Sequence, residues 1–186
     1  GWLVEMPEEF EALCATIEAP LFSYALRLTG NAAEAEELTQ DALVRLFHAL
    51  HQGRLRQNPR AYAFTTAHHL AMDRHRARAA ARKLVTLPPD DANIVRLHPQ
   101  QTPSPAQSSE RALLRKEIDK ALEALPQDQR AALLLREFGD LSYQEISDTL
   151  KVPLAQVKIW IYRGRKKLAQ LLDRDGQYIG NSHHGT

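Results

Sequence analysis

Histidines are the first residues to consider for chemistry, because imidazole nitrogens bind metal ions and transfer protons. His48 and His51 lie three residues apart, and two further pairs are adjacent in the sequence, His68 with His69 and His183 with His184. A zinc site needs three or four converging ligands, usually including thiolates or carboxylates at short spacings. The sequence has neither an HExxH nor a CxxC motif. The histidine pairs therefore predict no metal site.

Motifs for covalent and phosphate chemistry are also missing. The sequence has no GxSxG nucleophile motif and no glycine-rich phosphate loop. Its single cysteine, Cys14, lies in an apolar helical pattern and is expected to be a core residue rather than a redox group. One cysteine excludes an intrachain disulfide, as suits a reducing cytoplasm. We therefore expect no enzymatic activity and no cofactor.

The clearest chemical signal is a run of cations near the carboxyl end of the chain. Between Lys151 and Lys167 there are six lysines and arginines and no acid. Duplex DNA is the partner expected to bind such a positively charged face, because each cation near a phosphate releases condensed counterions. The alternative is a solvated helix whose basic end suits the helix dipole. The absence of accompanying acids favours DNA binding.

Three helices are expected to position these cations. Apolar residues at spacings of three and four predict a helix that ends before Gly139 and Asp140. A second helix begins after Ser142, an expected N-cap, and Glu145 completes a capping box. A third helix follows Pro153 and carries most of the cations. A short helix, a turn and a longer basic helix form a helix-turn-helix.

Residues 125–168 contain a specific series of motifs. In chain order they are LPxxxR from Leu125, LLLRE from Leu133, GDLSYQEIS from Gly139, VPLAQVK from Val152 and YRGRKKL from Tyr162. The series resembles the carboxy-terminal domain of bacterial sigma factors of the extracytoplasmic-function (ECF) group. The resemblance implies a subunit of RNA polymerase whose third helix enters the major groove at the minus-thirty-five element. The base-reading and phosphate positions of the family would be Gln156, Lys158, Tyr162 and Arg163, with Arg165 and Lys166 as further phosphate ligands.

The first half of the chain is divided by charge. Residues 1–53 contain nine acids and two bases, whereas residues 54–83 contain eight bases and one acid. Such a half-domain has an acidic face and a basic face. Tyr62 and Phe64 precede the arginines, and aromatic rings followed by bases suit a surface that stacks nucleobases. Packing of both rings in a helix core is the alternative.

Helical spacing predicts that these charged residues lie on helices. Two short helices are expected before Gly30, separated by Pro20. Asn31 and Asn58 are the expected N-caps of two longer helices, the first acidic and the second basic. Four residues of the acidic helix are expected to face the core, namely Leu38, Ala42, Leu46 and Leu50.

Two segments of the first half, LRLTGNAAEAEELTQDALVRLF from Leu26 and NPRAYAFTTAHHLAMDRHRAR from Asn58, resemble the amino-terminal domain of the same sigma factors. The resemblance implies that the acidic helix binds the clamp helices of the largest polymerase subunit through Glu37, Gln40 and Asp41. It also implies that residues 51–58 and the basic helix recognise and open the minus-ten element. The DNA-binding residues there would be Arg54, Arg56, Asn58, Tyr62, Arg74, Arg76 and Arg78.

Residues 84–109 differ from both halves. They hold five prolines among glutamine, serine, threonine and aspartate, which predicts a flexible, extended linker. The 186 residues thus divide into an amino-terminal domain at 1–83, the linker, a helix-turn-helix domain at 110–173 and a tail at 174–186. The expected fold class is all-α, with two small helical domains.

Charge and hydropathy limit how the chain can bind nucleic acid and where in the cell it is expected. The formal net charge is only +1, so nucleic-acid binding has to rest on local asymmetry rather than on a general polycation. No apolar run approaches the roughly 20 residues that cross a bilayer, and no secretory leader is recognised. We expect a cytoplasmic protein with no membrane contact of its own.

Three classes of function fit these features. The first is a sigma factor that binds core RNA polymerase and promoter DNA, in a stress or envelope response under the control of an anti-sigma factor. The second is a stand-alone, dimeric helix-turn-helix regulator that uses the same third helix on a palindromic site. The third is a helical protein whose basic surfaces bind acidic proteins. The paired acidic and basic helices favour the first class, since a simple regulator needs no such module.

Overall fold

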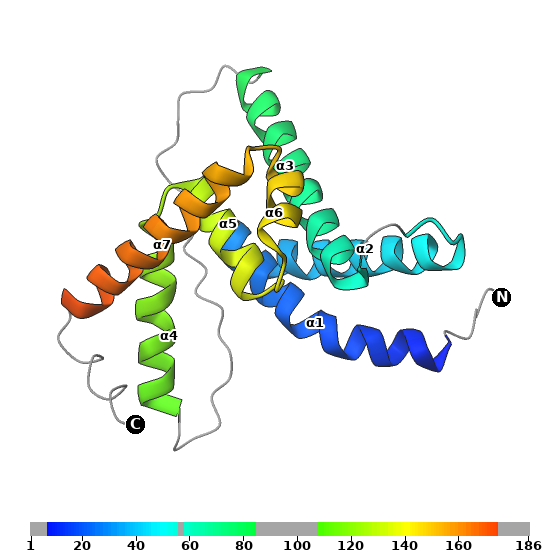
Figure 1. Cartoon of the computed structure of the whole chain (residues 1–186), viewed down its shortest axis with the longest axis horizontal. Coiled ribbons are helices and arrows are strands. Elements are labelled where there is room, and N and C mark those ends of the chain that lie inside the picture. Colours follow the sequence, from blue (N-terminus) through cyan, green and yellow to red (C-terminus); the bar gives the residue numbers. More distant parts are fainter. Residues whose placement is uncertain (1–6, 56–57, 85–107, 175–186) are drawn as a thin grey trace.

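The computed structural model describes residues 7–55, 58–84 and 108–174, and this part of the chain contains helices and no strand (Figure 1). The helices are α1 Glu8–Thr29, α2 Ala32–His51, α3 Pro59–Leu84, α4 Ser108–Glu123, α5 Gln127–Glu137, α6 Tyr143–Leu150 and α7 Leu154–Arg174. The prediction of an all-α fold is confirmed. Three sequence predictions lie outside the described residues: Arg56, nearly all of the linker, and the tail with its histidine pair.

Helices α1, α2 and α3 form one bundle. Its core contains Ile17, Leu21 and Tyr24 of α1 with Leu38 of α2 and Phe64 of α3, all of them almost completely buried. The burial of Phe64 confirms the core alternative for that ring. Helix–helix packing of apolar faces is therefore what holds the acidic helix against the basic one.

Both predicted N-caps of this bundle are present. Asn31 Oδ1 accepts a hydrogen bond from the backbone N–H of Glu34 at 3.0 Å, and Asn58 Oδ1 accepts one from Ala61 at 2.7 Å. Each side chain satisfies a donor that the first turn of a helix leaves without a partner. The starts of α2 and α3 are thus fixed by local sequence.

The core prediction for α2 is confirmed at Leu38, Ala42 and Leu46 and is wrong at Leu50, which is 36% exposed. Each step of four residues rotates a side chain by about 40° around a helix of 3.6 residues per turn. Leu50 therefore lies about 120° away from Leu38, and Ala49 is buried in its place.

The prediction of two short helices before Gly30 is wrong, because α1 is a single helix with Pro20 inside it. Proline has no N–H, so the carbonyl of Thr16, four residues earlier, lacks its usual helical donor. That carbonyl accepts a hydrogen bond from Arg60 Nη1 at 3.3 Å instead. Burial of Ile17 and Leu21 on either side of Pro20 helps to keep the helix continuous.

Helices α4 to α7 form the second group, which contains the predicted helix-turn-helix. The capping box at the start of α6 is confirmed: Glu145 N–H donates to Ser142 Oγ at 3.1 Å, and Ser142 N–H donates to Glu145 Oε2 at 2.8 Å. α6 ends at Leu150, and the left-handed backbone of the next residue, Lys151, starts the turn into α7. The core includes Leu135, Ile146 and Ile161, all at most 1% exposed.

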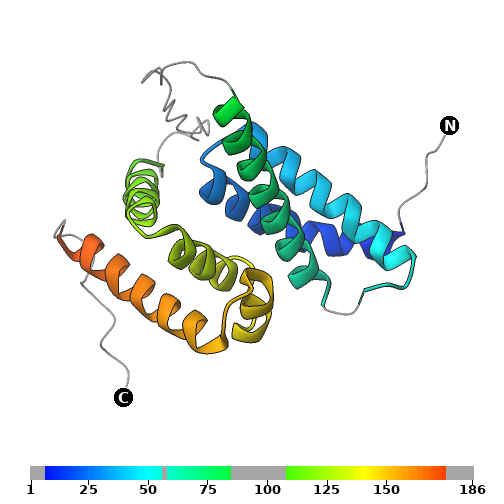
Figure 2. The same cartoon turned by 90° about the horizontal axis from the view of Figure 1, so that it is seen from above.

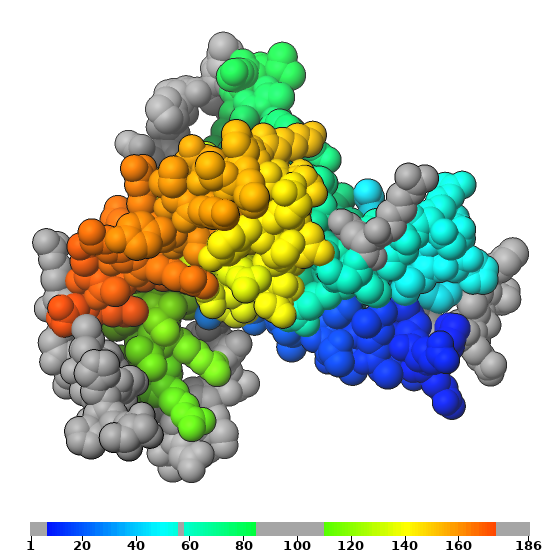
Figure 3. Space-filling model, viewed as in Figure 1, coloured from blue at the N-terminus to red at the C-terminus, as the bar shows by residue number. Residues whose placement is uncertain are grey.

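The two groups of helices lie in direct contact. Figure 2 shows them side by side, and in Figure 3 the surface of α6 meets that of α3 without a gap. Buried residues from both groups belong to one hydrophobic cluster. At Gly139, after α5, an added Cβ would lie 2.6 Å from the carbonyl of Leu135 in its own group and 3.0 Å from Cδ1 of Phe64 in the other, so the end of α5 and the close approach of the groups both disfavour a side chain there.

Candidate nucleic-acid interface

Helix α7 divides its side chains between the core and solvent. Val157 and Ile161 are buried, and Gln156 is half-buried. The other predicted minus-thirty-five residues are exposed, namely Lys158, Tyr162, Arg163, Arg165 and Lys166. The helix therefore presents its cations outward, as a DNA-reading helix requires.

One open hollow of about 640 Å³ is lined by four of these residues, namely Lys158, Tyr162, Arg165 and Lys166. Tyr143, in the first turn of α6, also lines it and was not singled out from the sequence. Its position directly after the expected N-cap Ser142 is the feature of the sequence that could have drawn attention to it. Gln156 and Arg163 do not line this hollow. Two phenol rings beside several cations suit contacts to sugar, phosphate and base edges.

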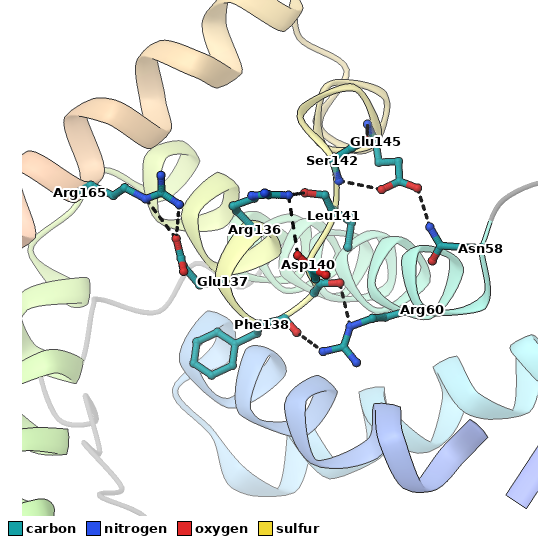
Figure 4. Close-up of polar contacts among 11 residues, drawn as sticks. Asn58, Arg60, Arg136, Glu137, Phe138, Asp140, Leu141, Ser142, Glu145 and Arg165 are labelled. Carbon is teal, nitrogen blue, oxygen red and sulfur yellow. Dashed lines mark hydrogen bonds and ion pairs between the residues drawn. The ribbon is translucent and has the colours of Figure 1, made fainter. Parts of the chain in front are cut away.

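Arg165 already has a protein partner. Its Nε lies 3.1 Å from Glu137 Oε1, and Nη2 contacts the same oxygen (Figure 4). The hydrogen bond to Glu137 raises the pKa of the Arg165 guanidinium. Because both side chains are half-exposed, the pair is a weak one that a phosphate can displace.

Acidic residues that were predicted to bind the polymerase form ion pairs with an arginine that was predicted to bind DNA. Arg74 Nη1 donates to Glu37 Oε2 at 3.0 Å, and Arg74 Nη2 donates to Asp41 Oδ2 at 2.9 Å. Gln40 is exposed beside them on α2. A predicted minus-ten residue is thus held by two predicted polymerase-binding residues.

The other two arginines of this set also have acidic partners. Arg78 Nη1 donates to Glu34 Oε2 at 2.9 Å, and Arg76 pairs with Asp73 on the same helix. Glu34 is buried, so its carboxylate depends on Arg78 for charge compensation. The pairing of Glu34 with α3 was missed because the partner lies 44 residues away in the sequence.

The predicted minus-ten residues do not form one patch. Arg54 is exposed after α2, whereas Tyr62 is half-buried against the core. Twelve residues separate Tyr62 from Arg74, which is about 18 Å along a helix. Asn58 lies at the contact with the second group of helices, where its Nδ2 donates to Glu145 Oε1 at 2.7 Å. The structure therefore spreads this set along the whole of α3.

Arg60 is a residue that sequence reasoning missed. Figure 4 shows its guanidinium reaching the turn after α5, where Nε donates to the carbonyl of Gly139 at 2.9 Å and Nη2 to that of Phe138 at 2.6 Å. Together with the bond to Thr16, these contacts tie α1, α3 and α5 to one side chain. The available signal was Pro20, which leaves the carbonyl of Thr16 in need of a donor.

Two adjacent histidines of α3 have partners in different groups of helices. His68 Nδ1 lies 2.8 Å from the hydroxyl of the fully buried Tyr24. Burial, and next to it the neighbouring His69, lower the pKa of His68 to about 4. Burial also raises the pKa of Tyr24, so both groups are neutral and share one hydrogen bond. His69 Nε2 lies 3.1 Å from the carbonyl of Thr149 on α6.

Within the residues that the structure describes, no group of three or more histidine, cysteine, aspartate or glutamate side chains lies close enough together to hold a metal ion. None of the described helices has the length and apolarity needed to cross a membrane.

Both groups of helices match known families of domains. Residues 16–81 match the family described as Sigma-70 region 2, and residues 115–168 match the family described as Sigma-70, region 4. The chain is 35% identical over 169 residues to the ECF RNA polymerase sigma factor SigE of Mycolicibacterium smegmatis, with 87% of this chain and 61% of the relative covered. It is 30% identical over 156 residues to the ECF RNA polymerase sigma factor EcfG of Rhodopseudomonas palustris, with 84% and 81% covered.

A solved structure has a similar fold. The sigma factor RpoE, in complex with the anti-sigma factor NepR from Bartonella quintana, gives a TM-score of 0.68 at 23% identity, covering 91% of this chain and 99% of that one. The domain matches and the relatives confirm the resemblance and the prediction of a non-enzymatic protein. This chain belongs to the ECF family of RNA polymerase sigma factors.

Proposed function

We propose that this chain binds core RNA polymerase and directs it to promoters that carry a minus-thirty-five and a minus-ten element. The observation that carries the proposal is the hollow on α7, where Lys158, Tyr162 and Lys166 meet Tyr143 on the exposed side of the helix-turn-helix. Cations placed at the two sides of an inserted helix fix its register on the phosphates, and the side chains between them read base edges.

Within α7 we assign Lys158 and Lys166 to phosphates and Tyr162 to the base edges, with Gln156 as a second base-reading residue. Arg163 and Arg165 are further phosphate ligands, the latter after exchange from Glu137. Trp160 has a supporting role, because it is half-buried and packs against the core cluster. Its ring stabilises the position of α7 on α5 and α6 rather than contacting DNA.

We assign the contact with the polymerase clamp to the exposed face of α2. Glu37, Gln40 and Asp41 share that face at helical spacing, and all three side chains are exposed. The two carboxylates also hold Arg74, so the face is less acidic than the sequence suggests. A basic partner surface would compete with Arg74 for them.

The first domain, residues 1–83, then captures the opened strand at the minus-ten element. Arg54 and Arg56, before α3, and Asn58, at its start, are assigned to this role together with Tyr62. Arg74, Arg76 and Arg78 extend the basic surface along α3, each with an acidic partner that a phosphate group would replace. The linker at 84–109 joins this domain to the helix-turn-helix domain at 110–173 and allows them to reach separate elements.

We also propose that an anti-sigma factor regulates this chain in the cytoplasm, as part of a stress or envelope response. The support for this is that the similar RpoE of Bartonella quintana was solved in complex with an anti-sigma factor. A partner of this kind would act by covering the same surfaces on α2, α3 and α7.

A reconstituted transcription assay tests the function. The chain is added to bacterial core RNA polymerase, and transcription starts are mapped across genomic DNA from the same source. Discrete starts that share two upstream elements, absent with core polymerase alone, are the expected result. No starts, together with tight DNA binding by the free chain, would instead favour the stand-alone regulator.

A further inference from the structure

One exposed side chain of α7 has no role in the proposed function, and the inference drawn from it rests on that function. Ile159 is 41% exposed, although it is a large apolar residue on a helix whose other outward side chains are mostly polar or charged. We propose that Ile159 determines promoter specificity by packing against the 5-methyl group of a thymine in the minus-thirty-five element. That methyl is the one apolar group on the major-groove edges of the four bases.

The position of Ile159 on α7 directs it away from the core. Val157 and Ile161 are buried and lie two residues to either side of it. Two residues correspond to about 200° on a helix of 3.6 residues per turn, so Ile159 lies about 160° around α7 from each of them. It is also within the first two turns of α7, and residues near the start of a recognition helix contact base edges. Its side chain therefore faces the floor of the groove when α7 enters it.

Ile159 is surrounded by residues assigned to DNA. On a helix surface, the neighbours of a residue lie three and four positions away. For Ile159 these are Gln156 and Tyr162 at three positions, and Ala155 and Arg163 at four. Three of these neighbours are assigned to base edges or phosphates, and the fourth, Ala155, is small and exposed. A duplex that contacts the three assigned residues together has to cover Ile159.

The setting of Ile159 distinguishes it from other exposed apolar residues. Single apolar residues are common on protein surfaces, and Leu113 of α4, 58% exposed, is such a case. Ile159 instead lies beside Tyr162, which is 66% exposed, and the two form an apolar strip. Helical spacing places Lys158 along one side of this strip and Arg163 along the other. Cations at both sides of an apolar strip suit a groove with phosphates at its two walls and base edges between them.

Isoleucine discriminates between bases because its side chain forms no hydrogen bonds. Over a thymine it gains contact with the methyl group, and burial of one such group raises affinity roughly fourfold. Over cytosine, adenine or guanine it would displace water from polar atoms without replacing their hydrogen bonds. The contact therefore favours thymine through a gain at one base and a cost at the other three.

Replacement of single thymines by deoxyuridine provides the test, because deoxyuridine lacks only the 5-methyl group and still pairs with adenine. Holoenzyme is assembled from the full chain and core RNA polymerase and is bound to a promoter found in the mapping experiment. Each thymine of the minus-thirty-five element is replaced in turn, on both strands. Promoter affinity is measured for the wild type, Ile159→Ala and Ile159→Val. Leu113→Ala is the matched control, since it shortens an exposed apolar side chain of α4.

We expect deoxyuridine at one or two positions to weaken binding by the wild-type holoenzyme roughly three- to fivefold. The same replacements should not affect Ile159→Ala, which should bind the thymine promoter as weakly as the wild type binds the deoxyuridine promoter. Ile159→Val lacks only the terminal methyl and should keep most of the sensitivity, and Leu113→Ala should keep all of it. Because the protein and the base are changed in one cycle, general effects of deoxyuridine on DNA shape cancel.

Three results would overturn the inference. The first is a minus-thirty-five element with no thymine on either strand, and the second is a wild-type holoenzyme that tolerates deoxyuridine at every position. The third is an Ile159→Ala holoenzyme with the same sensitivity to deoxyuridine as the wild type. The scan of the wild type needs no change in the protein, so it decides the question even where a variant folds poorly.

The same scan separates this inference from the proposed function. If discrete starts are found but no thymine methyl matters, the function stands and the role of Ile159 is wrong. If no starts are found and the free chain binds DNA, the proposed function is wrong, and the deoxyuridine scan on the site of the free chain decides the role of Ile159. A chain that neither initiates nor binds DNA would overturn both.

Discussion

Acidification is expected to destabilise the first domain through His68. The imidazole is 6% exposed, and its Nδ1 lies 2.8 Å from the hydroxyl of Tyr24 in the centre of the bundle. Protonation would place a charge in this apolar setting, which is why burial lowers the pKa of His68 to about 4. An unfolded chain offers the same side chain its ordinary pKa of about 6.5.

The sign and size of the effect follow from these two pKa values. Between about pH 6.5 and about pH 4 the unfolded chain binds a proton that the folded chain does not, so the free energy of unfolding falls as the pH falls. The contribution is fully present above about pH 6.5. A difference of 1.36 kcal/mol for each pKa unit gives about 3 kcal/mol in full, of which about 2 kcal/mol is lost by about pH 5.

Urea denaturation followed by far-UV circular dichroism at a series of pH values measures this loss. His68→Gln removes the ionisable group, so the variant should be less stable at neutral pH but should lack about 2 kcal/mol of the decline toward about pH 5. His75→Gln, at an exposed position of the same helix, is the matched control and should keep the decline of the wild type. Equal declines in the wild type and in His68→Gln would refute the assignment to His68.

Three further predictions concern the second domain. Ser142→Ala removes the hydroxyl that caps α6 and should lower the free energy of unfolding by about 1 kcal/mol in urea denaturation; no change would mean that the cap is not needed. Gly139→Ala would place a Cβ 2.6 Å from the carbonyl of Leu135 and should lower the melting temperature, whereas Gly164→Ala, with no contact closer than 3.5 Å, should not. Lys158→Ala should weaken promoter binding by the assembled holoenzyme and reduce its logarithmic salt slope by about one, with polymerase affinity unchanged. Equal loss of promoter and polymerase binding would count against its assignment to phosphate.

Local sequence predicted the helix starts well. Asn31, Asn58 and the Ser142–Glu145 pair form bonds to residues three positions away, so the pattern that predicts each cap also contains its partner. The same holds for the exposed cations of α7, because helical spacing alone decides which side chains turn away from the core. These elements account for most of the predicted minus-thirty-five site.

Contacts between distant parts of the chain could not be predicted in this way. The resemblance to sigma factors makes Arg74 an expected DNA ligand, yet its partners Glu37 and Asp41 lie 37 and 33 residues away in the sequence. Arg60 and Gly139 are 79 residues apart. Each of these pairs forms only when two helices pack, and the angle of packing does not appear in the periodicity of either helix.

Pro20 has a consequence for how this chain can change over evolutionary time. Pro20→Ala would return an N–H to α1, so that the carbonyl of Thr16 would be satisfied within its own helix and Arg60 would lose one of its three acceptors. The helix would gain stability while Arg60 lost its bond to α1 and was held less firmly beside the turn after α5. Selection for a stable helix therefore favours loss of this proline, whereas selection for the position of the Arg60 guanidinium favours keeping it.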